Sequence, residues 1–220
     1  MKYIKKYKLL LYILLIICAA IVFLIRFTDL RKPKSIIIER KTIVDETVPT
    51  VSDEPTIDFA TLRKKYNNKD IKGAIRINNE DFEEIVFQSN DNEYYLKHNY
   101  RGKKTNGEIF IDSELNIDES DIKVIYGEGS NKSDVFKNYY KKNYYEQHKF
   151  IELETDKLIY KYEVLSLIED KISYKNFDIE KVLDESKYVY NDDIENVKEY
   201  LVIINKKENK YYSIICKKVN

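Results

Sequence analysis

The feature of this sequence that most restricts its fold is a set of short stretches in which apolar residues recur at every second position. The stretches begin at Gly73 and continue almost to the C-terminus. A period of two places apolar side chains on one face of a β-strand and polar side chains on the other. The stretches are 75–77, 85–88, 108–112, 123–126, 150–154, 159–168, 200–204 and 211–216. About eight short strands at this spacing predict a mainly β protein, folded as a barrel or a sandwich.

Helical periodicity is confined to a few segments. An apolar stripe at i, i+3 and i+7 marks residues 56–67, and its members are Phe59, Leu62 and Tyr66. This pattern predicts a short amphipathic N-terminal helix, capped by Thr56 or Asp58. Short helical inserts are expected at 135–145 and 179–186.

The N-terminal part of the chain has a different composition. Residues 9–25 form an uncharged run of 17 residues, preceded by Lys2, Lys5, Lys6 and Lys8. At about 1.5 Å per residue the run spans about 25 Å, close to the lower limit for a bilayer core of about 30 Å. We expect a cytoplasmic N-terminus at 1–8 and a transmembrane anchor at 9–27. The alternative is a cleaved signal peptide, but no small-x-small cleavage pattern follows the run.

All three prolines lie between Lys32 and Pro55. Such a segment predicts an extracytoplasmic linker at 28–55, and an additional edge strand at 35–41 stays open. The basic residues on the two sides of the apolar run are nearly balanced, so they do not fix the orientation of the anchor.

Charge and composition exclude several classes of function. The 38 basic and 38 acidic residues balance to a net charge of zero, which leaves no overall electrostatic argument for nucleic-acid binding. Cys18 lies in the apolar run, so Cys216 has no partner for an intrachain disulfide. Two histidines without a cysteine cluster do not support a zinc site. The acidic residues of 112–121 lack the spacing and central glycine of a calcium loop and are expected to form a solvated turn. No metal or cofactor is expected.

The densest set of distinctive residues lies between Asn90 and Glu128. It contains three patterns: Asp91-Asn92-x-x-Tyr95-Leu96-x-His98, Gly107-x-Ile109-Phe110-x-Asp112, and Ile125-Tyr126-Gly127-Glu128. With these patterns the chain resembles the class B sortases, membrane-anchored cysteine transpeptidases of Gram-positive cell surfaces. The resemblance extends from about Ile57 to Val219. It implies a sortase-like eight-stranded β-barrel at 56–220, held outside the cell membrane by a single transmembrane helix.

The resemblance also implies a catalytic histidine, cysteine and arginine, and all three positions are substituted here. Glu128 stands at the position of the histidine, Asn205 at that of the cysteine and Tyr211 at that of the arginine. A carboxylate beside a thiol would raise the thiol pKa, whereas nucleophilic attack requires a lowered one. We therefore expect a pseudosortase that has no catalytic residues at these positions.

Cys216 is the remaining candidate nucleophile. If Asn205 pairs with Tyr211 across the C-terminal hairpin, then Tyr200 pairs with Cys216. That register puts Cys216 about five residues, or roughly 16 Å, along the strand from the catalytic position. We expect an ordinary core thiol.

The implied peptide groove consists of His98, Asp112, Tyr126, Glu128, Asn205 and Tyr211, with His98 expected to make a structural hydrogen bond. In the first hypothesis this groove holds a sorting-motif peptide, a surface protein or a cell-wall component without cleaving it. In the second the protein is an enzyme. It would be either a transpeptidase that attaches surface proteins to the cell wall through a non-standard active site, or a hydrolase built around Glu128. A third hypothesis keeps only the barrel, with the groove filled by Tyr211 and Tyr212.

Overall fold

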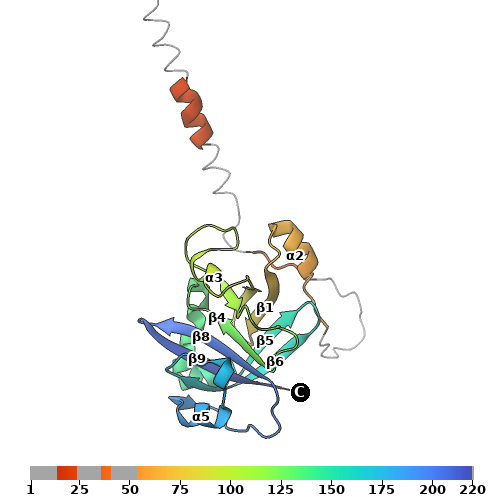
Figure 1. Cartoon of the computed structure of the whole chain (residues 1–220), viewed down its shortest axis with the longest axis vertical. Helices are drawn as coiled ribbons and strands as arrows, with labels where there is room; N and C mark the ends of the chain where they lie inside the picture. The colour runs from red at the N-terminus through yellow and green to blue at the C-terminus, as the bar shows by residue number, and fades with distance from the viewer. Residues whose placement is uncertain (1–13, 24–35, 41–53, 220) are drawn as a thin grey trace, which may run out of the picture. The chain divides into compact units, whose positions relative to one another are not determined.

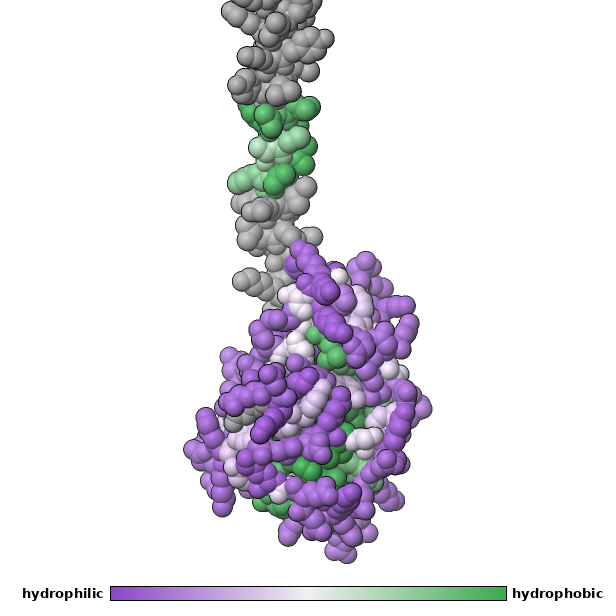
Figure 2. Space-filling view, turned by 60° about the vertical axis from the view of Figure 1, so that its left-hand side comes forward, coloured by the Kyte–Doolittle hydropathy of each residue, from purple (hydrophilic) through white to green (hydrophobic). Residues whose placement is uncertain are grey.

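The computed structural model describes residues 14–23, 36–40 and 54–219 and divides the chain into two units, with the boundary between Ile37 and Ile38. In the first unit, residues 14–23 are helical and strongly apolar (Figures 1 and 2). Across the described residues, no helix is both long and apolar enough to cross a membrane. The anchor expected at 9–27 extends beyond this helical stretch on both sides, and its ends, like residues 1–8, lie outside the described residues.

The second unit is a β-barrel. Its strands are β1 (Ile71–Ile77), β2 (Glu83–Phe87), β3 (Ile109–Ile111), β4 (Ile122–Tyr126), β5 (Phe150–Thr155), β6 (Ile159–Ile168), β7 (Tyr188–Val189), β8 (Tyr200–Lys207) and β9 (Lys210–Lys218). Eight of them follow the order β5-β1-β2-β3-β4-β8-β9-β6, and pairing of β6 with β5 closes the ring. The two-residue β7 pairs with β6 beyond the end of β5. The eight predicted strands are therefore all present, and the barrel alternative is the correct one.

The barrel interior is built from the alternating apolar residues that the sequence pattern indicated. Ile75, Ile125, Leu153, Val164 and Ile203 belong to one buried cluster that draws on β1, β4, β5, β6 and β8. Three tyrosines of the described residues, Tyr139, Tyr162 and Tyr212, are fully buried in the same cluster. Burial of this apolar area is the main stabilising contribution to the fold.

The N-terminal helix is α2 (Phe59–Tyr66), within the predicted segment. Asp58 is its N-cap, because its side chain accepts a hydrogen bond from the backbone nitrogen of Thr61. The helix ends at Asn67, whose φ of 48° is left-handed and redirects the chain into β1.

The other helical segments are α3 (Tyr94–Lys97), η1 (Asn131–Tyr140), α4 (Lys142–Gln147), η2 (Tyr174–Asn176) and α5 (Ile179–Asp184). The single helix expected at 135–145 is instead the 3₁₀-helix η1 followed by α4. Lys141 separates them because its backbone is extended, at φ −111° and ψ 119°. The short helix α3 had no counterpart in the sequence prediction.

The C-terminal hairpin corrects the predicted register by one residue. Only Glu208 and Asn209 form the turn, and both have positive φ, 50° and 66°. A two-residue turn of this kind matches the twist of the paired strands. The predicted pairing of Asn205 with Tyr211 would instead have left residues 206–210 as the loop. The observed pairs are Asn205 with Tyr212, Lys206 with Tyr211, Leu201 with Cys216 and Tyr200 with Lys217.

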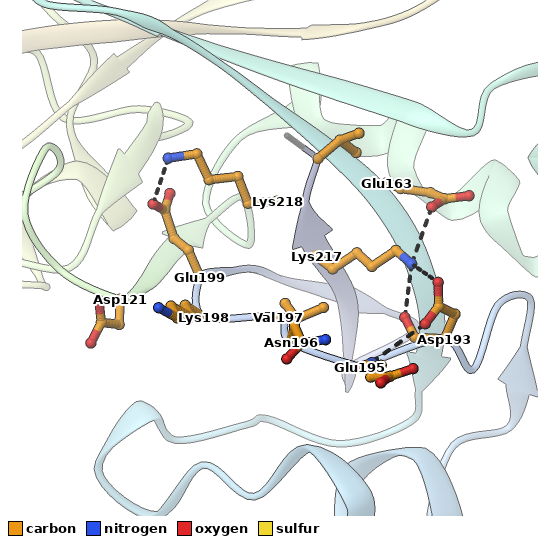
Figure 3. Close-up of a pocket in the computed structure, with 11 residues that line it drawn as sticks. Asp121, Glu163, Asp193, Glu195, Asn196, Val197, Lys198, Glu199, Lys217 and Lys218 are labelled. Atoms are coloured by element: carbon orange, nitrogen blue, oxygen red, sulfur yellow. Dashed lines mark hydrogen bonds and ion pairs between the residues drawn. The ribbon is translucent and has the colours of Figure 1, made fainter.

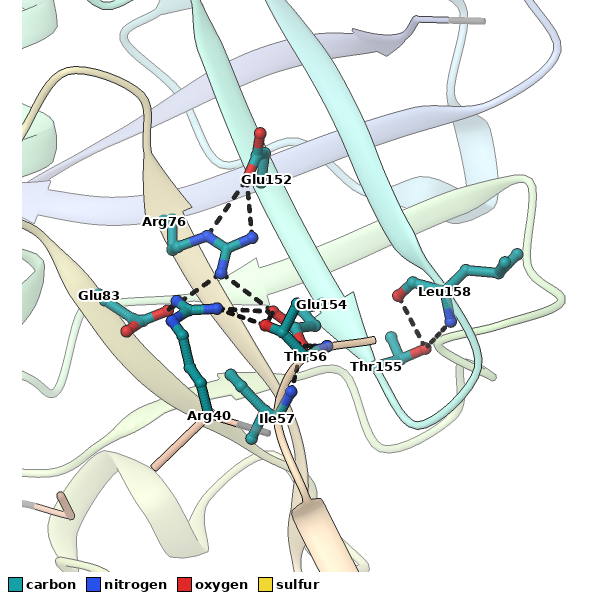
Figure 4. A network of polar contacts seen from close by, with 9 residues as sticks. All are labelled: Arg40, Thr56, Ile57, Arg76, Glu83, Glu152, Glu154, Thr155 and Leu158. Carbon is teal, nitrogen blue, oxygen red and sulfur yellow. Dashed lines mark hydrogen bonds and ion pairs between the residues drawn. The ribbon is translucent and has the colours of Figure 1, made fainter. Parts of the chain in front are cut away.

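A buried carboxylate fixes the entry of the chain into the barrel (Figure 4). Glu154 on β5 has a fully buried side chain and accepts hydrogen bonds from the backbone nitrogens of Thr56, at 2.5 Å, and Ile57, at 2.6 Å. It also pairs with Arg76 at 3.0 Å and with Arg40 at 3.5 Å. Arg40 forms an isolated β-bridge with Ile57, and the described residues 36–39 are not in a strand, so the edge strand that was left open is not formed there.

Candidate functional site

The candidate site lies where strands β4 and β8 end side by side. The two strands are parallel, Tyr126 is level with Ile204, and the backbone nitrogen of Gly127 donates to the Ile204 carbonyl at 2.8 Å. Glu128 therefore leaves β4 beside the last residues of β8. Strand β9 starts at the same edge, where Tyr211 is paired with Lys206. The three substituted positions, Glu128, Asn205 and Tyr211, therefore lie at neighbouring ends of β4, β8 and β9.

Glu128 is enclosed by two lysines. Its side chain is only 5% exposed; Lys206 Nζ lies 2.8 Å from one carboxylate oxygen and Lys171 Nζ lies 3.6 Å from the other. Hydrogen bonds to Glu128, and then to Tyr211, raise the pKa of Lys206. Lys206 is therefore a charged ammonium near neutral pH, which excludes it as an amine nucleophile.

Tyr211 forms the floor beneath these lysines. The Lys206 and Lys171 ammonium groups lie 4.4 Å and 4.9 Å from the centre of its half-buried ring. Lys171 also lies 5.1 Å from the ring of Tyr126. Both geometries are typical of cation–π contacts. Tyr212, which the third hypothesis placed in the groove, is fully buried in the barrel core instead, because neighbouring strand residues point to opposite faces.

Asn205 faces away from Glu128. Its side-chain nitrogen donates to the carbonyl and to the hydroxyl of Ser133 on η1, at 2.9 Å and 2.8 Å. The Ser133 hydroxyl in turn donates to the Gly127 carbonyl at 2.6 Å. Asn205 is 3% exposed. It therefore joins η1 to the ends of β4 and β8, while the next residue, Lys206, occupies the face shared by Glu128 and Tyr211.

Asp112 and Tyr126 form a buried pair beside this cluster. The Tyr126 hydroxyl and the Asn92 side-chain nitrogen each donate to Oδ2 of Asp112 at 2.9 Å, and the Glu114 backbone nitrogen donates to Oδ1. Burial, followed by the hydrogen bond to Asp112, raises the pKa of Tyr126, so its phenol stays protonated. Asp112 is 3% exposed and is not part of a solvated turn, which corrects the prediction for that residue.

Comparison with known proteins decides the family. No family model matches the chain. Sortase B of Staphylococcus aureus is 31% identical over 169 residues, which cover 70% of this chain and 68% of that protein. The chain belongs to the class B sortase family. Sortase B of Listeria monocytogenes is 28% identical over 130 residues, covering 57% of this chain and 52% of that protein.

Solved class B sortase structures share the fold. The X-ray structure of Clostridium perfringens sortase B has a TM-score of 0.63 and 22% identity, covering 74% of this chain and all of that chain. Sortase B of Bacillus anthracis has a TM-score of 0.64 and 19% identity, over 77% of this chain and 88% of that chain. The closed barrel with its short helices is thus a sortase fold.

The two lysines of the site were not predicted. Lys206 could have been predicted, because a two-residue turn at Glu208-Asn209 pairs it with Tyr211 and so places both side chains on the same face of the hairpin. Lys171 could not, because it reaches the site from the segment after β6. That segment is held by Ser213, whose hydroxyl donates to the Asp170 carbonyl at 2.7 Å and accepts from the Ile172 nitrogen at 3.3 Å.

His98 makes local contacts, as the class B pattern suggested. Its Nδ1 lies 2.9 Å from the Tyr94 carbonyl, and its ring stacks on the Tyr94 ring with the centroids 4.6 Å apart. Its backbone forms an isolated bridge with Lys104. These contacts tie His98 to α3 and the loop that follows it.

Cys216 lies in the barrel core. Its side chain is fully buried, and this burial raises the pKa of the thiol.

In a Cys18→Ser variant, we expect the Cys216 thiol to resist modification by a disulfide-exchange reagent such as Ellman's reagent while the protein is folded. The thiol should react fully in denaturant, since the thiolate is the reactive form. Modification of the native variant at the rate of a free thiol would contradict this placement.

The described residues contain no group of three or more His, Cys, Asp or Glu side chains that could hold a metal ion. Two cavities lie elsewhere in the domain. One, of about 570 Å³, is bounded by residues 193–199 and the end of β9, where Lys217 pairs with Asp193 and Glu163 (Figure 3). The other, of about 320 Å³, is lined mainly by residues 113–118. Neither cavity is lined by a residue of the candidate site.

Proposed function

We propose that this class B sortase-family protein has lost transpeptidase activity and serves as a membrane-anchored, extracytoplasmic scaffold that holds a peptide or protein. The observation that carries the proposal is the ion-paired state of Glu128, at the position where class B sortases have their catalytic histidine. Its carboxylate is bound by Lys206 and Lys171 and is only 5% exposed.

The chemistry of the other two positions supports the same conclusion. Transpeptidation requires a thiolate, a group that protonates the leaving amine, and a cation for the oxyanion. The side-chain nitrogen of Asn205 donates to Ser133, and position 211 carries a phenol in place of a guanidinium. Two ammonium groups are present, but both are already paired with Glu128. Neither the face shared by Glu128 and Tyr211 nor the position of Asn205 therefore supplies a nucleophile.

The anchored location rests on the N-terminal sequence. Residues 9–25 carry no charge, and within them residues 14–23 are helical with exposed apolar side chains. We place the domain outside the cell, in line with the class B resemblance. A peptide partner is supported by a solved sortase B that was determined in complex with triglycine.

Intact-mass spectrometry tests the loss of activity. The full chain in a mild detergent is incubated with a class B sorting-type peptide and a nucleophilic amine, and sortase B of S. aureus serves as the positive control. We expect neither an acyl adduct nor a cleaved peptide. An adduct would overturn the proposal, and its loss in Cys216→Ala would identify the nucleophile. Cleavage that persists in Cys216→Ala but stops in Glu128→Gln would instead show a hydrolase built around Glu128.

A further inference from the structure

The candidate site presents its positive groups outward and its negative groups inward. The side chains of Lys171 and Lys206 are 42% and 39% exposed, whereas that of Glu128 is 5% exposed. Both ammonium groups lie over the ring of Tyr211 and are bound to one shared carboxylate. Within this cluster the two ammonium groups are therefore more exposed to solvent than the carboxylate that they share.

Two further carboxylates near this face, Asp112 and Glu114, have partners of their own. Asp112 lies behind Tyr126, buried and saturated with hydrogen bonds. Glu114 lies further out, where it pairs with Lys175 at 2.9 Å and accepts a hydrogen bond from the Tyr174 hydroxyl. Glu128 is thus the one negative group among these that both lysines share, and it compensates only one of their two charges.

We propose that this face binds an acidic group of a peptide, which takes Lys171 and Lys206 as partners in competition with Glu128. The inference rests on the proposed binding function and names the class of ligand. A carboxylate fits because each ammonium has three donors and the pair carries one charge in excess of its partner. The tyrosine rings beneath the lysines hold the ammonium groups in place without neutralising them.

Binding should begin at Lys171 rather than at Lys206. The segment that carries Lys171 crosses the site between β6 and η2 and is attached at Ser213 through Asp170 and Ile172. The Lys171 contact with Glu128, at 3.6 Å, is the longer of the two ion pairs and has the more exposed lysine. Exchange of Glu128 for a ligand carboxylate should therefore begin at Lys171, because exposed pairs are weak and easily replaced.

Isothermal titration calorimetry with the full chain tests the charge preference. The probes are acetylated, amidated tri-glutamate, tri-glutamine and tri-lysine peptides. We expect tri-glutamate to bind best and its affinity to fall with added salt. Lys171→Ala and Lys206→Ala should each weaken it about two- to fivefold, the range expected for one exposed charge pair. Lys187→Ala is the matched control. Lys187 is 40% exposed, pairs with Glu169 rather than Glu128, and lies over the rings of Tyr140 and Tyr188 rather than that of Tyr211.

The decisive variant is Glu128→Gln, because the inference predicts a gain. Removal of the competing carboxylate should tighten tri-glutamate binding about two- to fivefold. Weaker tri-glutamate binding in Glu128→Gln, or stronger binding of tri-lysine by the native chain, would overturn the inference. Equal binding of tri-glutamine would also overturn it while leaving a peptide-binding role in place. An acyl adduct in the mass-spectrometry experiment would overturn the loss of activity and leave the charge preference standing.

Discussion

Replacing Glu154 with alanine is expected to lower the free energy of unfolding by about 3–5 kcal/mol, the usual cost of removing one partner of a buried ion pair. The side chain of Glu154 is 0% exposed and receives both arginines, Arg40 and Arg76. Without it, the backbone nitrogens of Thr56 and Ile57 lose their acceptor, and a buried donor without a partner is costly.

Urea unfolding measures this effect, and Glu152→Ala is the matched control. Glu152 lies on the same strand and pairs with the same Arg76 at 2.8 Å, but its side chain is 30% exposed. Exposed pairs contribute about 0–1 kcal/mol, so the control should change the midpoint little. Equal losses in the two variants would show that burial does not decide the energetics of this network.

The loss of structure in Glu154→Ala should be greatest at the start of the domain. Arg40 and Thr56 come from opposite ends of the segment 41–55, and both are bound to Glu154. In hydrogen exchange, we expect the amide of Ile57 to lose protection in Glu154→Ala and to keep it in Glu152→Ala. This readout separates release of the N-terminal segment from a general loss of stability.

The strands could be predicted from the sequence because short runs of apolar and β-branched residues mark them, although β3, β8 and the middle of β9 are buried on both faces. Alternation at 85–88, 123–126 and 200–204 corresponds to β2, β4 and β8. Closure into a barrel followed from the resemblance rather than from the alternation, since a sandwich has the same pattern. Asp58 was one of two candidate caps, and the other, Thr56, is engaged by Glu154 instead.

The composition of the site was harder to predict, because it depends on a one-residue register and on contacts between distant segments. In the predicted hairpin Asn205 was opposite Tyr211, whereas in the structure Lys206 holds that position. A shift of one residue exchanges the two faces of a strand, which is why Asn205 reaches Ser133 and Lys206 reaches Glu128. The approach of Lys171 depends on how the segment after β6 folds back, and no local pattern encodes that path.

Gly107→Ala is expected to destabilise the domain at the upper end of the range of about 1–3 kcal/mol that overpacking costs, or beyond it. A Cβ atom at Gly107 would lie 1.9 Å from the Tyr95 carbonyl oxygen and 2.8 Å from the carbonyl carbon of Leu96. Both are backbone atoms, so no side-chain rotation relieves the overlap. The backbone nitrogen of Gly107 also donates to the Gly129 carbonyl at 2.6 Å, directly after Glu128.

The change should therefore reach the candidate site as well as the stability. Displacement of Leu96 would disturb Gly129, because a Cβ atom at Gly129 would lie 2.7 Å from the carbonyl oxygen of Leu96. Gly102→Ala is the control: Gly102 is exposed, has a φ of 72°, and its nearest neighbour for a Cβ atom is the Tyr94 hydroxyl at 3.1 Å. Left-handed strain there costs about 1–2 kcal/mol without moving α3 against Gly129. Thermal unfolding should thus give Gly107→Ala a lower Tm than Gly102→Ala. The reverse order would show that α3 can move away from Gly107 at little cost.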